Sequence, residues 1–432
     1  MDEKYDVVVL GTGLSECVLS SLLSMEGKKV LHMDRNDYYG GECASLNLTQ
    51  DGQSPPADYG KDRDYNIDLV PKFMMANGEL VKILLYTDVT RYLEFQQIAG
   101  SFVYRDGKIS KVPATQMEAV TSPLMGFFEK RRAKSFFEFI QNYKHEDPNT
   151  HQGIDLEKTT MLQFGLESGT QDFIGHAMAL HPDEEYLNKA AIETFDRITL
   201  YVSSLAKYGK SPYIYPMYGL SELPQGFARL SAIYGGTYML DKPFDGLVME
   251  NGIVVGVKSG QEVIFYFCSK KVAKCGMVIG DPSYFPGKSK VIGKVIRSIC
   301  LLKQPIPNTG DADSCQIIIP QRQLSRKTDI YIACVCANGY YIAIVSTICE
   351  TSLPEKEIEP AYALLGHICD KFVTISDLKE PTDDGKHDNV FVTRTFDATS
   401  HFETVCNDIK DVYERVTGKP LDLSNPPNKQ QN

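Results

Sequence analysis

Hydrophobic periodicity divides the chain into two α/β stretches that flank a helical one. Residues 5–10 and 28–33 form short apolar runs typical of buried parallel strands, with a helical pattern between them. From about residue 113 to residue 208 the apolar positions recur with helical spacing, and strand patterns resume after that. The sequence therefore predicts an α/β fold in which a large domain with mixed β-sheets, residues 1–112 and 209–432, carries a small all-helical inserted domain, residues 113–208.

Two hairpins are predicted from turn dipeptides that lie between strand-like runs. In the first, Asp106-Gly107 joins residues 101–104 to residues 109–112. The second lies within residues 330–349, a stretch that carries no charge and is long enough to span a bilayer. Asn338-Gly339 stands in its middle between β-branched and aromatic residues, so we interpret the stretch as two buried strands and not as a membrane span.

Helical periodicity predicts long helices in the middle of the chain and another one after it. The expected ranges are residues 117–143, 168–180, 184–207 and 224–234. His181-Pro182 is a stop signal for the second helix, and the last helix would begin with a proline, Pro224, and end before Gly235. The segment 421–432, rich in Asn, Gln and Pro, is expected to be a disordered tail.

The first apolar run leads into a glycine motif that contains one unexpected residue. Gly11 and Gly13 provide the tight turn and the close backbone approach that a dinucleotide pyrophosphate requires. Asp34 follows the second apolar run at the distance of a ribose-binding acid. Position 16 should hold a third glycine but holds Glu16, whose carboxylate would compete for the helix N-terminal amides and repel a phosphate. The motif thus predicts a Rossmann-type scaffold with a degenerate cofactor seat, in which Asp34 bonds only to its own turn.

Composition limits the partners and the compartment. The formal net charge is −11, which argues against a nucleic-acid binder held by phosphate contacts. The basic triplet at residues 130–132 is interpreted as a solvated helix face. The acidic N-terminus does not resemble a signal peptide, and the 11 cysteines show neither disulfide nor zinc spacing. We therefore expect a cytoplasmic protein that needs no cofactor and no metal.

The sequence contains no recognisable catalytic constellation. There is no G-x-S-x-G elbow, no H-E-x-x-H pair and no Walker loop, so we expect a protein that is not an enzyme. Tyr, Met and Arg instead gather in residues 38–41 and 217–240, and these residue types are enriched in protein interfaces. Gln225 and Arg229 lie four residues apart on one helix face. Taken alone, the cluster fits a binding surface and a Tyr-rich core equally well.

Several blocks of the sequence resemble the Rab GDP-dissociation inhibitors, and the likeness covers nearly the whole chain. The blocks are residues 9–16, 32–36, 38–41, 210–213, 222–240, 281–284 and 401–404. The longest block, residues 222–240, is highly specific, whereas the glycine motif alone is not. The resemblance implies an FAD-monooxygenase-like domain that no longer uses flavin, together with a small helical domain.

The resemblance also implies a function. Members of this family bind GDP-bound prenylated Rab GTPases, inhibit GDP release, extract the Rabs from membranes and keep them soluble for recycling in vesicle transport. The implied Rab-binding platform lies on the large domain and consists of Tyr39, Glu222, Gln225, Arg229, Tyr238 and Met239. By the same resemblance we expect a cytoplasmic monomer that touches membranes peripherally and transiently.

In the same family the geranylgeranyl lipid of the Rab is held in the helical domain. The candidate lining residues in this chain are Phe173, Ile174, Met178, Ile192 and Phe195. Apolar residues at helical spacing look alike whether they form a bundle core or hold a ligand. A core position therefore remains the alternative for each of these five residues.

Two other functions compete with this hypothesis. Rab escort proteins resemble the chain as well, but they carry long insertions for which 432 residues leave no room. An FAD-dependent oxidoreductase that tolerates Glu16 is the contrasting class.

The chain also departs from the family pattern at three places. The segment 42–64 is shorter than usual, Tyr65 replaces a Trp, and the loop at residues 338–339 is reduced to a two-residue turn.

Overall fold

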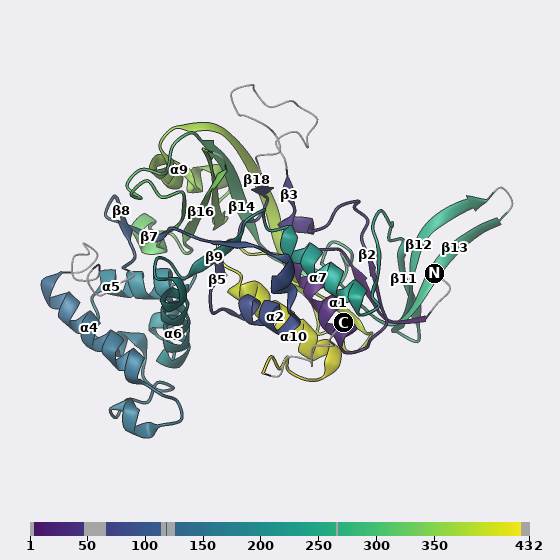
Figure 1. The fold of residues 1–432 in the computed structure, drawn as a ribbon, viewed down its shortest axis with the longest axis horizontal. Helices are drawn as coiled ribbons and strands as arrows, with labels where there is room; N and C mark the ends of the chain where they lie inside the picture. The colour runs from purple at the N-terminus through teal and green to yellow at the C-terminus, as the bar shows by residue number, and fades with distance from the viewer. Residues whose placement is uncertain are drawn as a thin grey trace.

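The computed structural model of the chain describes residues 4–46, 66–113, 118, 126–264, 267–337 and 339–424. Figure 1 shows two large β-sheets with helices packed between and around them, and a block of helices that extends to one side. The helices are α1 (Leu14–Met25), α2 (Glu79–Thr87), α4 (Phe127–Asn142), α5 (Ser168–Asp172), α6 (Ala191–Tyr208), α7 (Glu222–Ile233), α8 (Pro354–Glu357), α9 (Glu359–Leu365) and α10 (Glu403–Thr417). Shorter helical turns include η4 (Val89–Tyr92), η8 (Glu185–Leu187), η9 (Gln321–Leu324) and a π-helix, η7 (Phe173–Met178).

The first sheet contains the predicted β-α-β unit. Its strands are β1 (Lys4–Leu10), β2 (Val30–Met33), β10 (Thr237–Met239), β11 (Gly246–Glu250), β12 (Ile253–Ile264), β13 (Phe267–Gly280) and β19 (Val390–Val392). They run in the order β10-β2-β1-β13-β12-β11, with β19 also paired to β13. Val7 of β1 pairs in parallel with Val30 on one side and Met277 on the other. The Rossmann-type prediction is therefore confirmed, and strands from distant segments complete the sheet.

The second sheet is almost entirely antiparallel. Its strands are β7 (Gly100–Arg105), β8 (Lys108–Lys111), β14 (Ser289–Leu302), β15 (Ser314–Ile319), β16 (Ile330–Ala337), β17 (Tyr340–Ile348) and β18 (Ile368–Pro381), in the order β18-β14-β17-β16-β15-β7-β8. Both predicted hairpins, β7–β8 and β16–β17, are present, although Asn338 itself lies outside the described residues. Short strands β3 (Ser45–Leu46), β4 (Ile67–Asp68), β5 (Met74–Met75), β6 (Phe95–Gln97) and β9 (Tyr213–Pro216) form two small sheets. Within the described part of the chain, no helix has both the length and the apolar character to cross a bilayer.

Helix α1 is buried from Leu14 to Ser24 and packs against α7. Small side chains allow the two helices to approach closely, because bulky residues here would hold the backbones apart. The Oγ atoms of Ser20 and Ser24 lie 3.3 and 2.8 Å from Oγ of Ser231 on α7. This contact fixes α7 beside the first sheet and so determines the surface that α7 presents.

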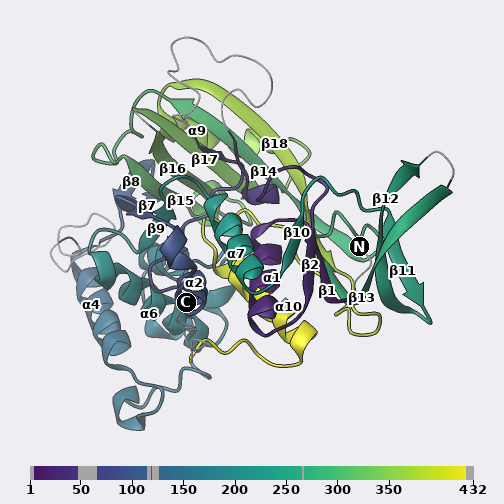
Figure 2. The ribbon, with the colours of Figure 1, turned by 45° about the vertical axis from the view of Figure 1, so that its right-hand side comes forward.

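The helical block, residues 127–208, lies between β8 and β9 in the sequence and projects from the second sheet in both ribbon views (Figure 2). Its centre is aromatic: Phe136, Phe139, Phe164 and Phe195 are in mutual contact, with ring centroids 5.2–6.1 Å apart. Three of these five pairs are edge-to-face, an arrangement that the ring quadrupole favours, and the other two are tilted.

The structure corrects the predicted helix boundaries. The helix expected at residues 168–180 is α5 followed directly by the π-helix η7, in which the Ala179 amide bonds to the Ile174 carbonyl. The helix expected from residue 184 begins at Ala191, because η8 and an extended backbone at Ala190 precede it. Helix α7 begins at Glu222, which places Pro224 within the first turn, where a proline lacks no intrahelical bond.

Two further sequence predictions concern the start of the helix at residues 117–143 and the tail from residue 421. Residues 114–117 and 119–125, the start of the expected helix 117–143, lie outside the described residues, and α4 begins at Phe127. The tail was expected to be disordered from residue 421, but Leu421 and Leu423 pack against the main hydrophobic core, the cluster of buried apolar residues that includes parts of α1, α7 and the helical block. Residues 425–432 lie outside the described residues.

Candidate functional site

The turn after β1 has the geometry of a dinucleotide-binding turn. Gly11 has a φ of +92°, and a Cβ at this position would lie 2.9 Å from Oδ2 of Asp281. Both conditions require glycine here. Gly13 is the N-cap residue of α1, so the helix starts where a pyrophosphate would approach it.

The Glu16 side chain folds back over this helix start. Its Oε2 lies 2.5 Å from the place that a Cβ on Gly13 would take, and its Oε1 accepts a hydrogen bond of 2.8 Å from the Thr393 hydroxyl. Burial, and then the nearby Asp281 carboxylate, raise the pKa of Glu16 to about 8. The carboxyl group is therefore mostly neutral at pH 7, and it opposes a phosphate by occupying its seat more than by repelling its charge.

Asp34 is fully engaged by the protein. Its Oδ2 accepts hydrogen bonds from the amide and the hydroxyl of Thr12, each 2.6 Å long. Its Oδ1 accepts from the Asn36 amide at 2.8 Å and from the Tyr284 hydroxyl at 3.3 Å. Only the Asn36 bond lies within the turn of Asp34, so the prediction that Asp34 bonds only to its own turn is wrong: Thr12 and Tyr284, distant in sequence, supply the other donors. A ribose would have to displace all of these donors.

A cavity of about 460 Å³ remains at this place. It is lined by the glycine turn together with Glu16, Asp34, Asp281 and Tyr284. The Arg35 guanidinium stacks 4.4 Å from the centre of the Tyr284 ring beside it. Because the phosphate seat and the ribose acid are both satisfied internally, these residues do not fit a flavin dinucleotide.

We expect the purified protein to carry no flavin and the variant Glu16→Gly to bind none. Removing Glu16 frees the helix start but leaves Asp34 bonded to Thr12, so the ribose still has no acceptor. The absorbance spectrum of the native protein and a fluorescence titration of the variant with FAD measure this. A stoichiometric flavin spectrum in either sample would contradict the description of the seat as degenerate.

We expect Glu16→Gln to remove a pH dependence of stability. The pKa of Glu16 is near 4.5 in the unfolded chain and about 8 in the folded protein. Between these pH values the folded state binds one proton more than the unfolded state. The free energy of unfolding of the wild type therefore falls as the pH rises from 4.5 to 8. The substituted amide stays neutral, so the variant should gain roughly 2–4 kcal/mol over wild type between pH 5 and pH 8.5. Urea unfolding of both proteins across this pH range measures the difference, and Glu138→Gln, at an exposed site, is the control. If the free energies of unfolding of wild type and Glu16→Gln change in parallel with pH, the raised pKa of Glu16 is wrong.

A second cavity, the platform groove, lies along helix α7 and has a volume of about 410 Å³. It brings together five of the six residues that the resemblance assigned to a binding platform: Tyr39, Glu222, Gln225, Arg229 and Tyr238. Tyr92 and Leu93, from η4 and the residue after it, also line the groove. No local pattern pointed to these two, because only the packing of η4 against α7 brings them here.

The aromatic side of the groove is anchored to the first sheet. The Tyr238 ring stacks on His32 with centroids 4.4 Å apart, and its hydroxyl donates to Oγ of Ser20 at 3.0 Å. Tyr39 lies beside it, with ring centroids 6.2 Å apart. Met239, the sixth predicted residue, follows Tyr238 in β10 and packs against the cluster on the other face of the sheet, as alternation along a strand requires.

The polar residues of the groove are spaced along one side of α7. Glu222, Gln225 and Arg229 follow at intervals of three and four residues, which places them on one face of the helix. The exposed Arg229 guanidinium stacks 4.4 Å from the centre of the Tyr92 ring. Burial raises the pKa of Glu222, and its Oε2 is buried with no hydrogen-bond partner among the described residues. The groove thus has a half-buried carboxyl group near one end and an exposed cation, held by Tyr92, near the other.

Four of the five candidate lipid-lining residues are buried in the helical block. Phe173, Ile174, Met178 and Phe195 expose 0–5% of their surface, and Ile192 is half-buried. All five belong to, or pack against, the main hydrophobic core. In this state of the molecule they are core residues, so a lipid among them would need the helices to move apart.

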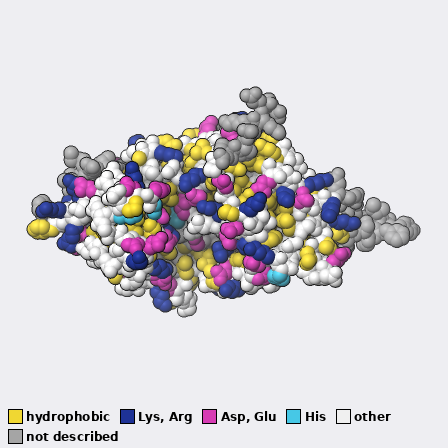
Figure 3. Space-filling model, turned by 90° about the horizontal axis from the view of Figure 1, so that it is seen from below, with side chains coloured by type: hydrophobic (Ala, Val, Ile, Leu, Met, Phe, Trp, Pro, Cys, Tyr) yellow, Lys and Arg dark blue, Asp and Glu magenta, His cyan; other side chains and the backbone are white. Residues whose placement is uncertain are grey.

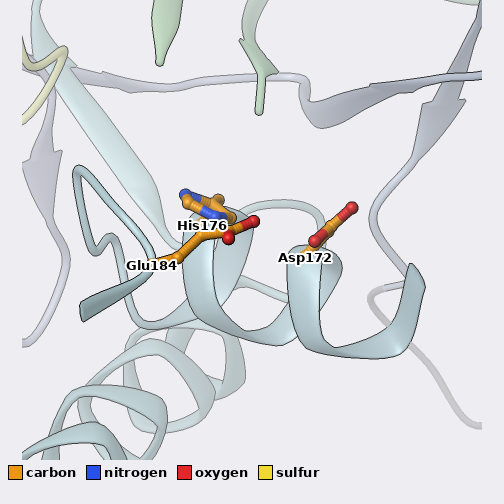
Figure 4. Close-up of side chains that lie close together, drawn as sticks. All are labelled: Asp172, His176 and Glu184. Carbon is orange, nitrogen blue, oxygen red and sulfur yellow. The ribbon is translucent and has the colours of Figure 1, made fainter. Parts of the chain in front are cut away.

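One cluster of side chains has the composition of a metal site. Asp172 and His176 of the α5–η7 segment and Glu184 each offer one ligand atom within 4.8 Å of the others (Figure 4). The Arg322 guanidinium, however, lies 2.5 Å from Glu184 and 3.4 Å from Asp172. Arg322 already supplies the positive charge that a metal ion would bring, so we assign the cluster to ion pairing.

Comparison with known proteins gives a consistent result. The family model described as "GDP dissociation inhibitor" matches residues 1–428. The chain is 57% identical to the probable secretory pathway GDP dissociation inhibitor 1 of Schizosaccharomyces pombe, covering 99% of both chains. It is 54% identical to the Rab GDP-dissociation inhibitor of Saccharomyces cerevisiae, covering 98% of this chain and 97% of that protein.

Solved structures agree with these relatives. The crystal structure of a Rab GDI from Plasmodium falciparum superposes with a TM-score of 0.92 at 47% identity, covering 98% of this chain and all of the other. An oxidoreductase from Methanosarcina mazei superposes with a TM-score of 0.57 at 12% identity, covering 95% and 100% of the two chains. The second likeness concerns the fold alone.

Proposed function

The chain belongs to the GDP dissociation inhibitor family, and we propose on that basis that its platform groove binds Rab GTPases in their GDP-bound, prenylated form. The names of its relatives, a probable secretory pathway GDP dissociation inhibitor and a Rab GDP-dissociation inhibitor, support a role of this kind in the secretory pathway. In the proposed cycle the protein inhibits GDP release, extracts the Rab from the membrane and keeps it soluble until it is delivered again.

The platform groove is the single observation that carries this proposal. Five of the six platform residues implied by the family resemblance line it, although they come from three separate segments of the sequence. Arg229 offers an exposed cation that is held by the Tyr92 ring. A partner that supplies an acidic group near Arg229 would form a charge-assisted contact with it.

For the geranylgeranyl lipid we propose the helical block. A soluble complex requires the isoprenoid to leave water, and burial of each CH₂ is worth about 0.8 kcal/mol. Helices α4 and α6 and the α5–η7 segment have aromatic and aliphatic inner faces that would suit such a chain once they separate. Contact with the membrane would then be peripheral and transient, and the complex would contain one copy of this protein.

We further propose that the protein has no catalytic activity of its own. Its family consists of non-catalytic regulators, and the internally satisfied turn at Gly11 and Gly13 supports the same conclusion for this chain. Nucleic acid is not a proposed partner, because acidic and basic side chains are interspersed on the face shown in Figure 3 and the net charge is −11.

The deciding experiment measures extraction. Membranes that carry prenylated Rab loaded with GDP or with GTP are incubated with the protein, and the Rab released into the supernatant is quantified. We expect release of the GDP-bound form and little of the GTP-bound form. Equal release of both forms, or of neither, would reject the proposal. Stimulation of Rab prenylation in the presence of the geranylgeranyl transferase would instead favour an escort protein.

A further inference from the structure

A buried polar cluster ties the helical block to the large domain. Nδ1 of His176, in the π-helix η7, lies 2.7 Å from Oδ2 of Asp329 in the segment before β16. Both side chains are fully buried. The Asp329 carboxylate is itself fixed, because its Oδ1 accepts a hydrogen bond of 2.8 Å from the Gln321 amide. Burial alone would disfavour a charged imidazole, but the Asp329 carboxylate outweighs it and the pKa of His176 is raised.

The same cluster has a second, more exposed part. Arg322, in η9 of the large domain, pairs with Glu184 and with Asp172 of the helical block. Gln323 adds a long contact of 3.5 Å to Oδ2 of Asp172. Figure 4 shows Asp172 and His176 on successive turns of one helical segment, with the Glu184 side chain reaching towards them. Asp172 and His176 thus bring two of these charged contacts to one short stretch of helix, α5–η7.

This stretch of helix also carries three of the proposed lipid-lining residues. Phe173, Ile174 and Met178 belong to η7, and they are packed into the main core. A π-helix, whose hydrogen bonds span one residue more than those of an α-helix, is an uncommon conformation that is frequent at functional sites. Here the Tyr186 ring and hydroxyl pack directly on Gly175, where they leave no room for a Cβ.

We propose that the contacts of His176 with Asp329 and of Arg322 with Asp172 and Glu184 form a latch that holds η7 closed, and that isoprenoid binding in the helical block requires this latch to open. The inference rests on the proposed function of the block. Within the described part of the chain, η7 lines neither of the two cavities described above, so room for a lipid must come from movement of this segment or of the helices against it. Outward movement of η7 would separate His176 from Asp329.

The latch would set the apparent affinity for the lipid. A ligand that binds only the open state has an apparent dissociation constant raised by the rarity of that state. Contacts present only in the closed state make the open state rarer. Weakening the latch should therefore tighten lipid binding, whereas contacts within the block that do not reach the large domain should leave it unchanged.

The test uses the full-length protein and a fluorescent geranylgeranyl-cysteine probe. Arg322→Gln removes the exposed half of the latch, and Asp329→Asn removes the buried ion pair while keeping the acceptor for Gln321. The control Lys189→Gln breaks an exposed pair with Glu185 that lies wholly within the block. We expect the two latch variants to bind the probe about two- to tenfold more tightly than wild type, and the amides of residues 173–178 to exchange hydrogen faster. Lys189→Gln should behave as wild type, and binding of unprenylated GDP-bound Rab should be equal in all four proteins.

The outcomes separate the latch from the function on which it rests. If wild type binds the probe and both latch variants bind it with the same or lower affinity, the latch is overturned and the lipid role stands. If wild type does not bind the probe at all, both hypotheses are rejected: the helical block does not bind the lipid, and the latch does not control lipid binding. Should Asp329→Asn fail to fold, Arg322→Gln decides alone, because its side chain is 36% exposed and its loss leaves the core intact.

Discussion

Tryptophan in place of Ile174 or Met178 should abolish extraction of prenylated Rab from membranes while unprenylated, GDP-bound Rab still binds the platform groove. The two residues lie four positions apart in η7, and both are buried in the helical block. An indole at either position would fill the space that an isoprenoid needs once the helices separate. The platform groove lies on α7 of the large domain, so its residues should be unaffected.

An extra ring in a packed core is itself destabilising, by about 1–3 kcal/mol, so the loss of stability must be separated from the loss of lipid binding. A matched control is Leu156→Trp, because Leu156 is 1% exposed in the same block but is not a proposed lining residue. All three variants should unfold at lower urea concentration than wild type. Extraction lost equally in the control, or lost together with binding of unprenylated Rab, would place the lipid elsewhere.

Arg229→Ala should weaken binding of GDP-bound Rab by about 2–5 kcal/mol, the loss typical of a charge-assisted contact that an interface buries. In the free protein Arg229 is exposed and contacts the Tyr92 ring, so its removal should change the free energy of unfolding by less than about 0.5 kcal/mol. Calorimetric titration with Rab and urea unfolding of the variant measure the two quantities.

The natural control is Arg91→Ala. Arg91 precedes Tyr92, is 60% exposed and pairs with Asp88, but it does not line the platform groove. This variant removes the same charge from the same neighbourhood and should bind Rab as wild type does. A large drop in the stability of Arg229→Ala would show that the residue supports the core. Equal losses of affinity in the two variants would show that only the general charge of the region matters.

Local patterns in the sequence were sufficient for the elements that local interactions determine. The strand at residues 5–10, the glycine turn and both hairpins are encoded by short-range preferences, and they occur where predicted. The π-helix at 173–178 could not be predicted in this way, because it differs from an α-helix by a single hydrogen-bond shift and has the same apolar residues.

The platform groove needed information beyond the local pattern. Glu222, Gln225 and Arg229 share a helix face and were predicted together from the family resemblance, with which their spacing agrees. Tyr92 was missed because it reaches the groove only through tertiary packing. Met239 could have been separated from Tyr238 by the sequence alone, since successive residues of a strand point to opposite faces. The structure places Met239 on the other face of the sheet from Tyr238, and its role in Rab binding stays a prediction.

The order of strands in the first sheet has a consequence for how the protein is made. Strand β1 is synthesised well before β13, with which it pairs, and β13 in turn pairs with the still later strand β19. At about 5–20 residues per second, synthesis of the intervening chain takes on the order of a minute. During that time one edge of β1, an apolar strand, has no partner, and pairings of such long range are slow to form. The first sheet is therefore completed only after β19 has been synthesised, and until β13 is in place the open edge of β1 can pair with strands of other chains.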